Sequence, residues 1–525
     1  MSTKLNVRAY NNKELLLFPA SIGDFLPKEH IAHVVDEVVE QLDLTAYYNK
    51  ISNVGNPSYH PLMMIKIWFY AYVTKTYSSR KIEEKLYTDV AFIYLAGMQK
   101  PDFKTISEFR RKYAEELRNS FVEIVEICHR LGMIDLDVIS LDSKVTKANA
   151  SASRTYTEDE LIKEQQEIEK AIKKFLDKAN QIDDEEDKKY GPDKRSYELL
   201  EDIRDKEQRI KKLKQIVEQL KQARQKLKQD NKRKINLTDN DAQFQKDKTK
   251  KVIGYRCHIA VDAKQQIIVA NDVTEKQADQ DQLLPMVNQV IEVADKIKQT
   301  DKQSLIDNTS SNIAQEESKI KVVADSGYSS GSNLKELQKY EDKIDAYIPD
   351  QTYQAKIRNK KISPFEKDNF VYDETTDEFI CPLGNKLHYF SSKRKNGQTI
   401  KIYRCNNSKN CKYFAQCTTS LRGRIIEVYE NEHLIKQMRQ KLSTEEAKKI
   451  YIIRKITAEP VLGNISHNLC FKEFLLRGIK KVKTEFSLIC TAHNLLKIAK
   501  FIKELGVTLK EALAMLTLST AFNTS

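Results

Sequence analysis

Apolar residues repeat at helical spacing over the first 130 positions. The runs "HPLMMIKIWFYAYVTKTYSSRKIEEKL" and "TISEFRRKYAEELRNSFVEIVEICHRLG" contain few turn-forming residues. Thr105 and Glu108 have the spacing of a capping box at a helix start, and Gly132 is typical of a helix end. The pattern predicts an all-helical N-terminal domain over residues 1–132.

One short segment of this domain has two interpretations. The stretch "YSSRKIEEKL" (Tyr77–Leu86) predicts a helix capped by Ser78 or Ser79 that presents Arg80 and Lys81. A helix-turn-helix reader of DNA presents basic residues in this way. A surface helix whose charges are simply solvated fits the same residues equally well.

The period then changes to that of strands. Residues 138–141 form a β-branched run that ends at Asp142, and "KIKVVA" (residues 319–324) ends at Asp325, where Ser326-Gly327 predicts a turn. Between them, "KVIGYRCHIAVD" and "QQIIVANDVT" predict a hairpin, followed by a helix; "KIDAYIPD" predicts a last strand. These segments indicate an α/β core in two parts, residues 133–156 and 236–360. A structural alternative for Asp325 is to cap the helix that begins near Ser332.

The segment between the two parts of the core is highly charged and repeats in sevens. It predicts an inserted coiled-coil helical hairpin over residues 157–235, broken at "YGPD", either as a strut or as an arm that dimerises. The apolar positions of the repeat are Leu161, Ile168, Phe175 and Ile182, then Ile203, Ile210 and Val217, with Leu213, Leu220 and Leu227 at the complementary spacing.

A second insert, residues 361–425, is rich in cysteine, and helical periodicity returns over residues 426–525. Four cysteines of the insert would suit a structural Zn²⁺ ion: Cys381, Cys405, Cys411 and Cys417. Their spacing lacks a C-x-x-C pair, so free thiols remain the alternative, and His388 could replace one ligand. The other cysteines, Cys128, Cys257, Cys470 and Cys490, lie in apolar runs and are expected in the core.

The chain has 525 residues and a formal net charge of +13. This balance suits a polyanion such as nucleic acid or an acidic membrane face, although a Lys-rich composition produces it without any ligand. The longest apolar stretch, Met63–Val73, is interrupted by Lys66 and is too short to span a bilayer, and the N-terminus lacks a signal-peptide core. We therefore expect a cytoplasmic protein without membrane contact.

Three acids carry the predicted chemistry. Two acids at strand ends of one core and a third on a late helix are sufficient to hold two Mg²⁺ or Mn²⁺ ions, which prefer carboxylate oxygens and clamp the reacting oxygens of phosphoryl transfer. Asp142 and Asp325 are the first two. Glu459 is the third, because in "YIIRKITAEPVLGNISHN" it follows Tyr451 and Arg454 on a basic helix.

Other acids and other roles compete for this third position. The rival acids are Glu445, Glu446 and Glu485. Pro460 predicts a kink or a helix start next to Glu459, which would then be an acid complementing the positive end of a helix dipole.

The motifs "SLDSKVTKANAS", "GYRCHIAVD", "VVADSGYSSGSNLKEL" and "YIIRKITAEPVLGNISHNLCFKEFLLRGIKKVKTEFSLICTAHNLLKI" resemble, in this order, the DDE transposases of bacterial insertion sequences. The N-terminal run "NPSYHPLMMIKIWFYAYVTKTYSSRKIEEKLYTDVAFIYLAGMQKPDFKTISEFRRKY" is similar to the helical domain that precedes the catalytic core in one large group of them. The resemblance implies an RNase H-like core in which Asp142, Asp325 and Glu459 hold the metals, with Tyr451 and Arg454 as accessories.

The chain departs from the family pattern at three places. Four residues separate Arg454 from Glu459 where many relatives have three, Ser466 stands where a Lys is expected seven residues after the Glu, and Ser143-Lys144 replaces Gly-Thr after the first Asp. The change at Ser466 removes one expected phosphate contact and leaves the three acids intact. Relatives often carry a comparable Cys-rich insert before the Glu helix.

The predicted function is metal-dependent cleavage and strand transfer of insertion-sequence DNA, cut-and-paste transposition. The expected partners are double-stranded DNA, both terminal inverted repeats and target, and a second copy of the chain in the DNA complex. The candidate DNA contacts are Arg80, Arg110, Arg111, Arg477, Lys480, Lys481 and Lys483. The alternatives are an inactive DNA-binding regulator or dimerisation scaffold derived from such an enzyme, and a structure-specific nuclease with the same metal site.

Overall fold

The structure is a computed structural model that describes residues 21–51, 57–190, 200–247, 250–306, 318–353, 363–395, 398–406 and 411–522. The chain divides into two compact units: residues 1–127 with 491–525, and residues 128–490. In the described part of the chain, no helix is both long enough and apolar enough to cross a bilayer.

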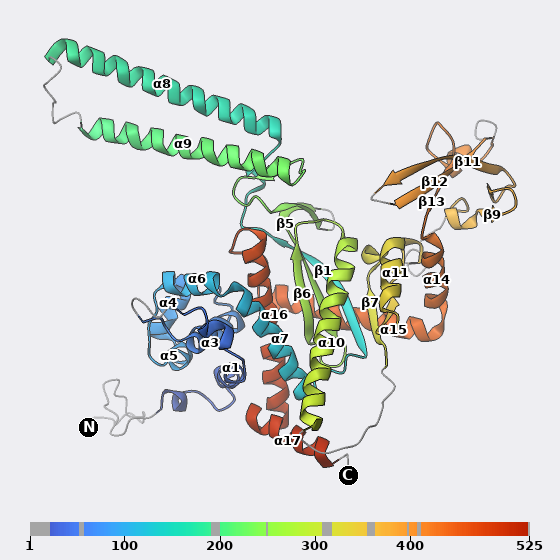
Figure 1. The fold of residues 1–525 in the computed structure, drawn as a ribbon, viewed down its shortest axis with the longest axis horizontal. Coiled ribbons are helices and arrows are strands. Elements are labelled where there is room, and N and C mark those ends of the chain that lie inside the picture. Colours follow the sequence, from blue (N-terminus) through green and yellow to red (C-terminus); the bar gives the residue numbers. More distant parts are fainter. Residues whose placement is uncertain are drawn as a thin grey trace, which may run out of the picture. The chain divides into compact units, whose positions relative to one another are not determined.

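The first unit is helical in its described residues, as predicted (Figure 1). Its elements are η1 (Ile22–Phe25), α1 (Ile31–Glu40), α2 (Thr45–Tyr48), α3 (Pro61–Val73), α4 (Ser79–Thr88), α5 (Val90–Leu95), α6 (Phe103–Lys112), most of α7 (Ala114–Arg130), the second half of α16 (Ile479–Leu505) and α17 (Leu509–Phe522). Helix α3 is buried along almost its whole length, because its apolar residues surround the helix instead of forming one stripe. Helix α1 contacts both α3 and α17.

Helix boundaries in this unit differ in detail from the sequence interpretation. The predicted start at Thr105 is wrong: α6 begins at Phe103, and the side chain of Asp102 accepts a hydrogen bond from the backbone N–H of Thr105 at 2.6 Å. A carboxylate at the N-cap satisfies an otherwise unpaired N–H of the first turn. Helix α4 begins at Ser79, and Ser78 occupies the N-cap position but makes no side-chain capping hydrogen bond. Gly132 follows α7 with φ +66°, as predicted.

The second unit is built on a mixed sheet in the order β4-β5-β1-β7-β8, with β6 also pairing β5. The strands are β1 (Val138–Lys147), β4 (Gln243–Asp247), β5 (Lys250–Asp262), β6 (Ile268–Thr274), β7 (Ile320–Ala324) and β8 (Ile344–Tyr347). Strands β1, β7 and β8 are parallel, whereas β5 is antiparallel to β1, β4 and β6.

Strand β1 does not end at Asp142 as the sequence interpretation expected. It continues for five residues to Lys147, because β5 pairs with it as far as Gly254. A Cβ atom at Gly254 would collide with the carbonyl oxygen of Thr146, so glycine is needed for this close approach. Strand β1 therefore pairs with β5 both before and after Asp142, which fixes the backbone at this residue.

Helices cover the sheet (Figure 1). Helix α10 (Leu283–Ile306) packs on β5 and β6, and α15 (Glu445–Gly463) packs on β1, β5, β7 and β8. Helix α11 (Gly331–Leu337) contacts α10 and α14 (Glu432–Ser443), and α14 contacts α15.

The charged insert forms two long helices, α8 (Glu158–Tyr190) and α9 (Leu200–Gln229), which contact each other (Figure 1). The short strands β2 (Thr155–Tyr156) and β3 (Ile235–Asn236) pair at their base. Apolar packing is concentrated there, on Leu161, Leu220, Ala223 and Leu227, whereas Phe175 is 38 % exposed. Most of the predicted break, residues 191–193, and the side chains of Ile182 and Ile203 lie outside the described residues.

The Cys-rich insert contains a five-stranded antiparallel sheet in the order β13-β12-β11-β10-β9. Its elements are β9 (Val371–Asp373), β10 (Glu378–Ile380), β11 (Lys386–Lys395), β12 (Gln398–Cys405), α13 (Phe414–Cys417) and β13 (Ile425–Tyr429). Phe379, Leu387, Tyr403 and Ile426 form its core. The prediction for Cys470 is wrong, since it is exposed; Cys128, Cys257 and Cys490 are buried.

Candidate active site

Asp142 and Asp325 lie on neighbouring strands at the same level of the sheet. Strands β1 and β7 are parallel, and Leu141 pairs with Ala324. The residues that follow this pair along the two strands are the two acids. Each acid accepts a hydrogen bond on Oδ1 from the following backbone N–H, Ser143 at 2.8 Å and Ser326 at 2.7 Å. Asp325 thus caps its own short turn, and the cap of α11 is Ser330 instead.

Glu459 is joined to Asp142 through Arg454. One guanidinium nitrogen of Arg454 donates to Asp142 Oδ2 at 3.2 Å, and the other donates to Glu459 Oε1 at 3.0 Å. Arg454 is buried and Glu459 is half exposed. Residues that are more than 300 positions apart in the chain therefore meet at one point, where α15 crosses β1.

The surroundings of Asp142 disfavour the charged form of its carboxyl group. Burial raises the pKa of this carboxyl to about 6, and Arg454 and the N–H of Ser143 only partly offset that rise. The negative charges of Asp325 and Glu459 raise the pKa further, which shows that both acids act on Asp142 electrostatically. The site has more negative charge than its own cation neutralises.

The three acids provide the oxygen donors that Mg²⁺ and Mn²⁺ prefer, and the raised pKa of Asp142 marks a charge that a cation would stabilise. Within the described residues, however, no group of three or more His, Cys, Asp or Glu side chains is already arranged to hold a metal ion. At this site the guanidinium of Arg454 lies between Asp142 and Glu459. A divalent ion held by both of these carboxylates would have to displace this guanidinium.

Helix α15 passes through Pro460 instead of starting there, so the predicted helix start is wrong and Glu459 is far from the N-terminal turn. Proline leaves the carbonyl oxygen four residues earlier, that of Ile456, without its helical N–H. The amide Nε2 of Gln266 donates to this oxygen at 2.8 Å. The helix then passes into a π-turn over Asn464–Asn468.

The rival acids have other surroundings. Glu445 and Glu446 form the first turn of α15, and Glu485 is buried and accepts the backbone N–H groups of Leu475 and Leu476 at 2.9 Å each. Tyr451 is buried with its ring edge-on to that of Tyr353.

Lys144 is a residue of the site that the sequence interpretation missed. It lies two residues after Asp142 in β1, on the same face of the strand, and its ammonium donates to Ser466 Oγ. Ser466 is the position where a lysine was expected. The ammonium group next to position 466 therefore comes from Lys144 on β1. The alternation of side chains along β1 after Asp142 was the sequence signal that could have identified Lys144.

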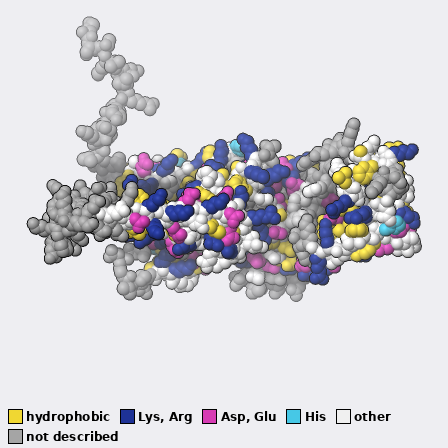
Figure 2. All heavy atoms as spheres, turned by 90° about the horizontal axis from the view of Figure 1, so that it is seen from above, with side chains coloured by type: hydrophobic (Ala, Val, Ile, Leu, Met, Phe, Trp, Pro, Cys, Tyr) yellow, Lys and Arg dark blue, Asp and Glu magenta, His cyan; other side chains and the backbone are white. Residues whose placement is uncertain are grey.

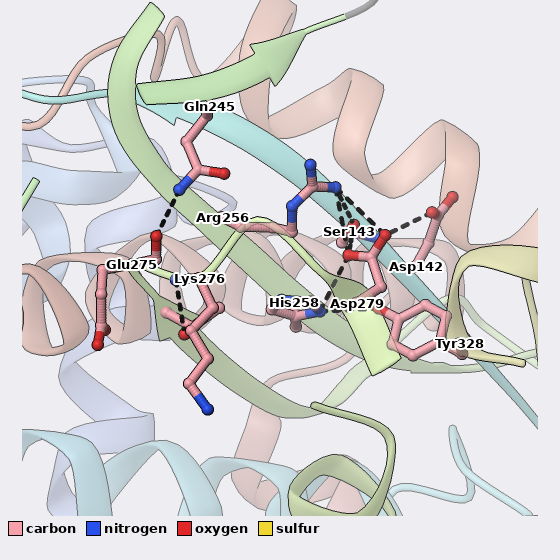
Figure 3. A network of polar contacts seen from close by, with 10 residues as sticks. Asp142, Ser143, Gln245, Arg256, His258, Glu275, Lys276, Asp279 and Tyr328 are labelled. Carbon is pink, nitrogen blue, oxygen red and sulfur yellow. Dashed lines mark hydrogen bonds and ion pairs between the residues drawn. The ribbon is translucent and has the colours of Figure 1, made fainter. Parts of the chain in front are cut away.

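The structure also shows a polar network next to Asp142 that the sequence did not reveal (Figure 3). Ser143 Oγ donates to Asp279 Oδ1 at 2.7 Å, and Arg256 donates to the same carboxylate. His258 lies 2.8 Å from the hydroxyl of Tyr328. Ser143, Arg256, His258 and Tyr328 lie in three of the motifs quoted from the sequence, but these motifs are far apart in the chain and nothing in them indicates that the side chains meet.

The candidate DNA contacts have different degrees of exposure. Arg110 is a correction: it is buried, with its guanidinium over the ring of Trp68 and a bond to Tyr72, because its position on α6 faces α3. Arg80 is exposed and stacks on Phe103, and Arg111 is exposed and pairs with Glu108.

The second basic segment is residues 477–483, in which Lys480 and Lys481 are exposed. Arg477 bonds to Asn149, and Lys483 pairs with Asp272. On the face seen in Figure 2, Lys and Arg side chains are interspersed with Asp and Glu. On this face the positive charge is thus mixed with negative charge.

The four cysteines of the second insert, Cys381, Cys405, Cys411 and Cys417, line one small pocket. Backbone N–H groups of Leu383 and Asn385 point at Cys381 Sγ, at 3.4 and 3.3 Å. His388 is paired with Glu378, so it is not available as a substitute ligand. Within the described residues, these side chains are not already arranged as a metal site either.

Two comparisons with protein families support one assignment. A family described as "Transposase domain (DUF772)" matches residues 20–112, and one described as "Transposase DDE domain" matches residues 380–499. The second match contains Tyr451, Arg454 and Glu459, whereas both aspartates lie outside it. No curated protein and no solved structure gave a significant match. A helical transposase domain followed by a DDE domain supports the identification of this chain as a DDE transposase of the insertion-sequence type.

Proposed function

We propose that this chain cleaves insertion-sequence DNA and transfers its freed strand to target DNA, in a metal-dependent cut-and-paste reaction. The observation that carries the proposal is the meeting of Asp142, Asp325 and Glu459 around Arg454 on the sheet. The strand order β6-β5-β1-β7-β8, with β5 antiparallel, supports an RNase H-like core.

Asp142, Asp325 and Glu459 would hold two Mg²⁺ or Mn²⁺ ions. When bound, such ions activate the attacking oxygen and stabilise the leaving oxygen of an in-line phosphoryl transfer. The chain's own residues do the rest. The side chain of Asp142 is largely buried and its backbone is fixed by the ladder, so its carboxylate needs little reorganisation, and Asp325 is fixed by its capped turn.

Arg454 has two roles in this proposal. Without DNA it neutralises Asp142 and Glu459, and with DNA it moves to a phosphate oxygen on which charge develops. Tyr451, one helical turn earlier, packs in an apolar cluster with Val138 and Val323 of the sheet and keeps that part of α15 against the sheet. Lys144 supplies a second cation to the phosphate backbone beside the acids.

The N-terminal helices, with Arg80 and Arg111, and the segment with Arg477, Lys480, Lys481 and Lys483 are the proposed contacts to terminal repeats and target. A second copy of the chain is the proposed partner in the DNA complex, and the cytoplasm is the proposed compartment.

The test is a strand-transfer assay with the ends of the element. Wild-type protein with Mg²⁺ or Mn²⁺ should nick the ends and join them to target, and Asp142→Asn, Asp325→Asn and Glu459→Gln should each abolish both steps. Asp241→Asn is the matched control, because Asp241 is also a largely buried, ion-paired carboxylate, with Lys226 as its partner, away from the acids. DNA binding without cleavage by wild type would favour a regulator, and cleavage without joining would favour a nuclease.

We also propose that the four cysteines of the second insert bind a structural Zn²⁺ ion. The support is their common pocket and the two N–H groups directed at Cys381 Sγ, an arrangement that stabilises a thiolate. Protein purified under reducing conditions should contain about one zinc per chain, and Cys381→Ser with Cys417→Ser should lose it. Retention of zinc in that double variant would contradict the proposal; Cys470→Ser, an exposed cysteine elsewhere, is the control.

A further inference from the structure

A largely buried polar cluster lies on the face of β1 opposite to Asp142. We call Ser143, Arg256, His258, Asp279 and Tyr328 the β5 polar cluster, because its two basic residues come from β5 (Figure 3). Successive residues of a strand point to opposite faces, so Ser143 points away from the side of Asp142. Asp279 accepts hydrogen bonds from Ser143 Oγ at 2.7 Å and from Arg256 at 3.2 and 3.3 Å.

The cluster joins the two segments that carry the first two acids. Ser143 directly follows Asp142, and Tyr328 is three residues after Asp325 in the turn that this acid caps. Tyr328 is almost fully buried, and its hydroxyl lies 2.8 Å from Nδ1 of His258, which is opposite Ser143 in the β1–β5 register.

Gly327 brings the same turn directly onto the Asp279 carboxylate. A Cβ atom at position 327 would lie 2.8 Å from Asp279 Oδ2, which is closer than such contacts allow. Space, and not backbone conformation, therefore requires glycine here. The Asp279 carboxylate is thus in contact with Ser143, next to Asp142, and with the turn that follows Asp325.

A buried ion pair is a poor source of net stability, since desolvation of both charges offsets their attraction. Its directional bonds do, however, hold two segments at a fixed spacing. We propose that the β5 polar cluster is a positioning device that sets the separation of Asp142 and Asp325, and through it the affinity of the site for divalent ions. This inference rests on the proposed metal-dependent function.

Residues that orient metal ligands typically change metal affinity about 10- to 100-fold when they are removed. The experiment is a Mn²⁺ titration of the full-length protein without DNA, followed by thermal shift and by the electron paramagnetic resonance signal of free Mn²⁺. Asp279→Asn and Gly327→Ala should each raise the half-saturating Mn²⁺ concentration by about tenfold or more. The double variant should add little, because both changes break one contact.

The control is Asp241→Asn, which should lower the melting temperature and leave the half-saturating Mn²⁺ concentration unchanged. Failure of wild type to bind Mn²⁺ would reject the proposed function. Binding by wild type together with equal binding by Asp279→Asn and Gly327→Ala would reject the positioning device alone. If Asp279→Asn does not fold, Tyr328→Phe, which removes only the hydroxyl bonded to His258, is judged in the same way: weaker Mn²⁺ binding supports the device and unchanged binding overturns it.

Discussion

At the scale of single residues, three consecutive side chains of β1 have different partners. Asp142 bonds to Arg454 of α15 and Lys144 bonds to Ser466 in the π-turn after α15, whereas Ser143 points to the other side, where it bonds to Asp279. The alternation of a strand thus separates the groups that we propose to contact DNA and metal from the group that we propose to position them.

Lys144→Gln is expected to lower the rate of DNA cleavage by about tenfold, because a charged hydrogen bond to phosphate contributes on the order of 1.5–3 kcal/mol. The loss should be accompanied by a weaker dependence of DNA binding on salt. The control is Lys147→Gln, at an exposed lysine of the same strand that pairs with Glu473. Equal rates for the wild type and Lys144→Gln would contradict the assignment.

Asp142 makes the stability of the metal-free protein depend on pH. Burial raises its pKa from 3.8 to about 6, so the folded state binds this proton more tightly than the unfolded chain does. The contribution to the free energy of unfolding is therefore present below about pH 4 and is lost as the pH rises to about 6, by up to about 3 kcal/mol.

Asp142→Asn should remove this loss, so its stability relative to wild type should increase between about pH 4 and pH 6 and then stay level. Urea unfolding of both proteins without metal measures the difference. Asp262, whose pKa burial also raises to about 6, is present in both proteins and cancels. Parallel stability profiles for the two proteins would show that Asp142 is not the group responsible.

At the scale of elements, α15 places Glu459 by continuing through a proline. The carbonyl of Ile456 loses its helical donor at Pro460, and Gln266, from the turn between β5 and β6, replaces that donor. The sequence interpretation expected a kink or a start at Pro460 because it considered the helix alone, without a side chain from another element.

Gln266→Ala is expected to destabilise the protein by about 1 kcal/mol, since it leaves the carbonyl oxygen of Ile456 without its partner. In a Pro460→Ala background the same change should cost much less, because the alanine restores the backbone N–H that proline lacks. Chemical denaturation of the four proteins in this double-mutant cycle measures the coupling. Additive effects would mean that Gln266 acts independently of the proline.

At the scale of the whole molecule, long inserts interrupt the sheet without entering it. The pair Tyr156–Ile235 closes the base of α8 and α9, so the helices leave and return at adjacent residues. Of the apolar heptad positions whose side chains are described, those near this base are buried. The insert is therefore expected to be separable from the fold of the sheet.

Replacing residues 157–234 by Asn-Gly, which suits a two-residue hairpin turn between paired strand residues, should leave a protein that unfolds cooperatively and keeps its Mn²⁺-induced thermal shift. Its melting temperature should change by only a few degrees, because the core of the sheet shares few contacts with the insert. Loss of cooperative unfolding would show instead that the two helices support the sheet.

Local patterns were sufficient to predict several features of this protein. Period and turn residues identified the helical N-terminal region, strands β5, β7 and β8, and the charged helical insert, because these depend on neighbouring residues in the chain. The tertiary structure decided what depends on distant partners: the extension of β1 past Asp142, the burial of Arg110 against Trp68, the passage of α15 through Pro460, and the meeting of Lys144 with Ser466. In each case the deciding contact joins separate elements. A local sequence pattern contains no information on a group that approaches from another element.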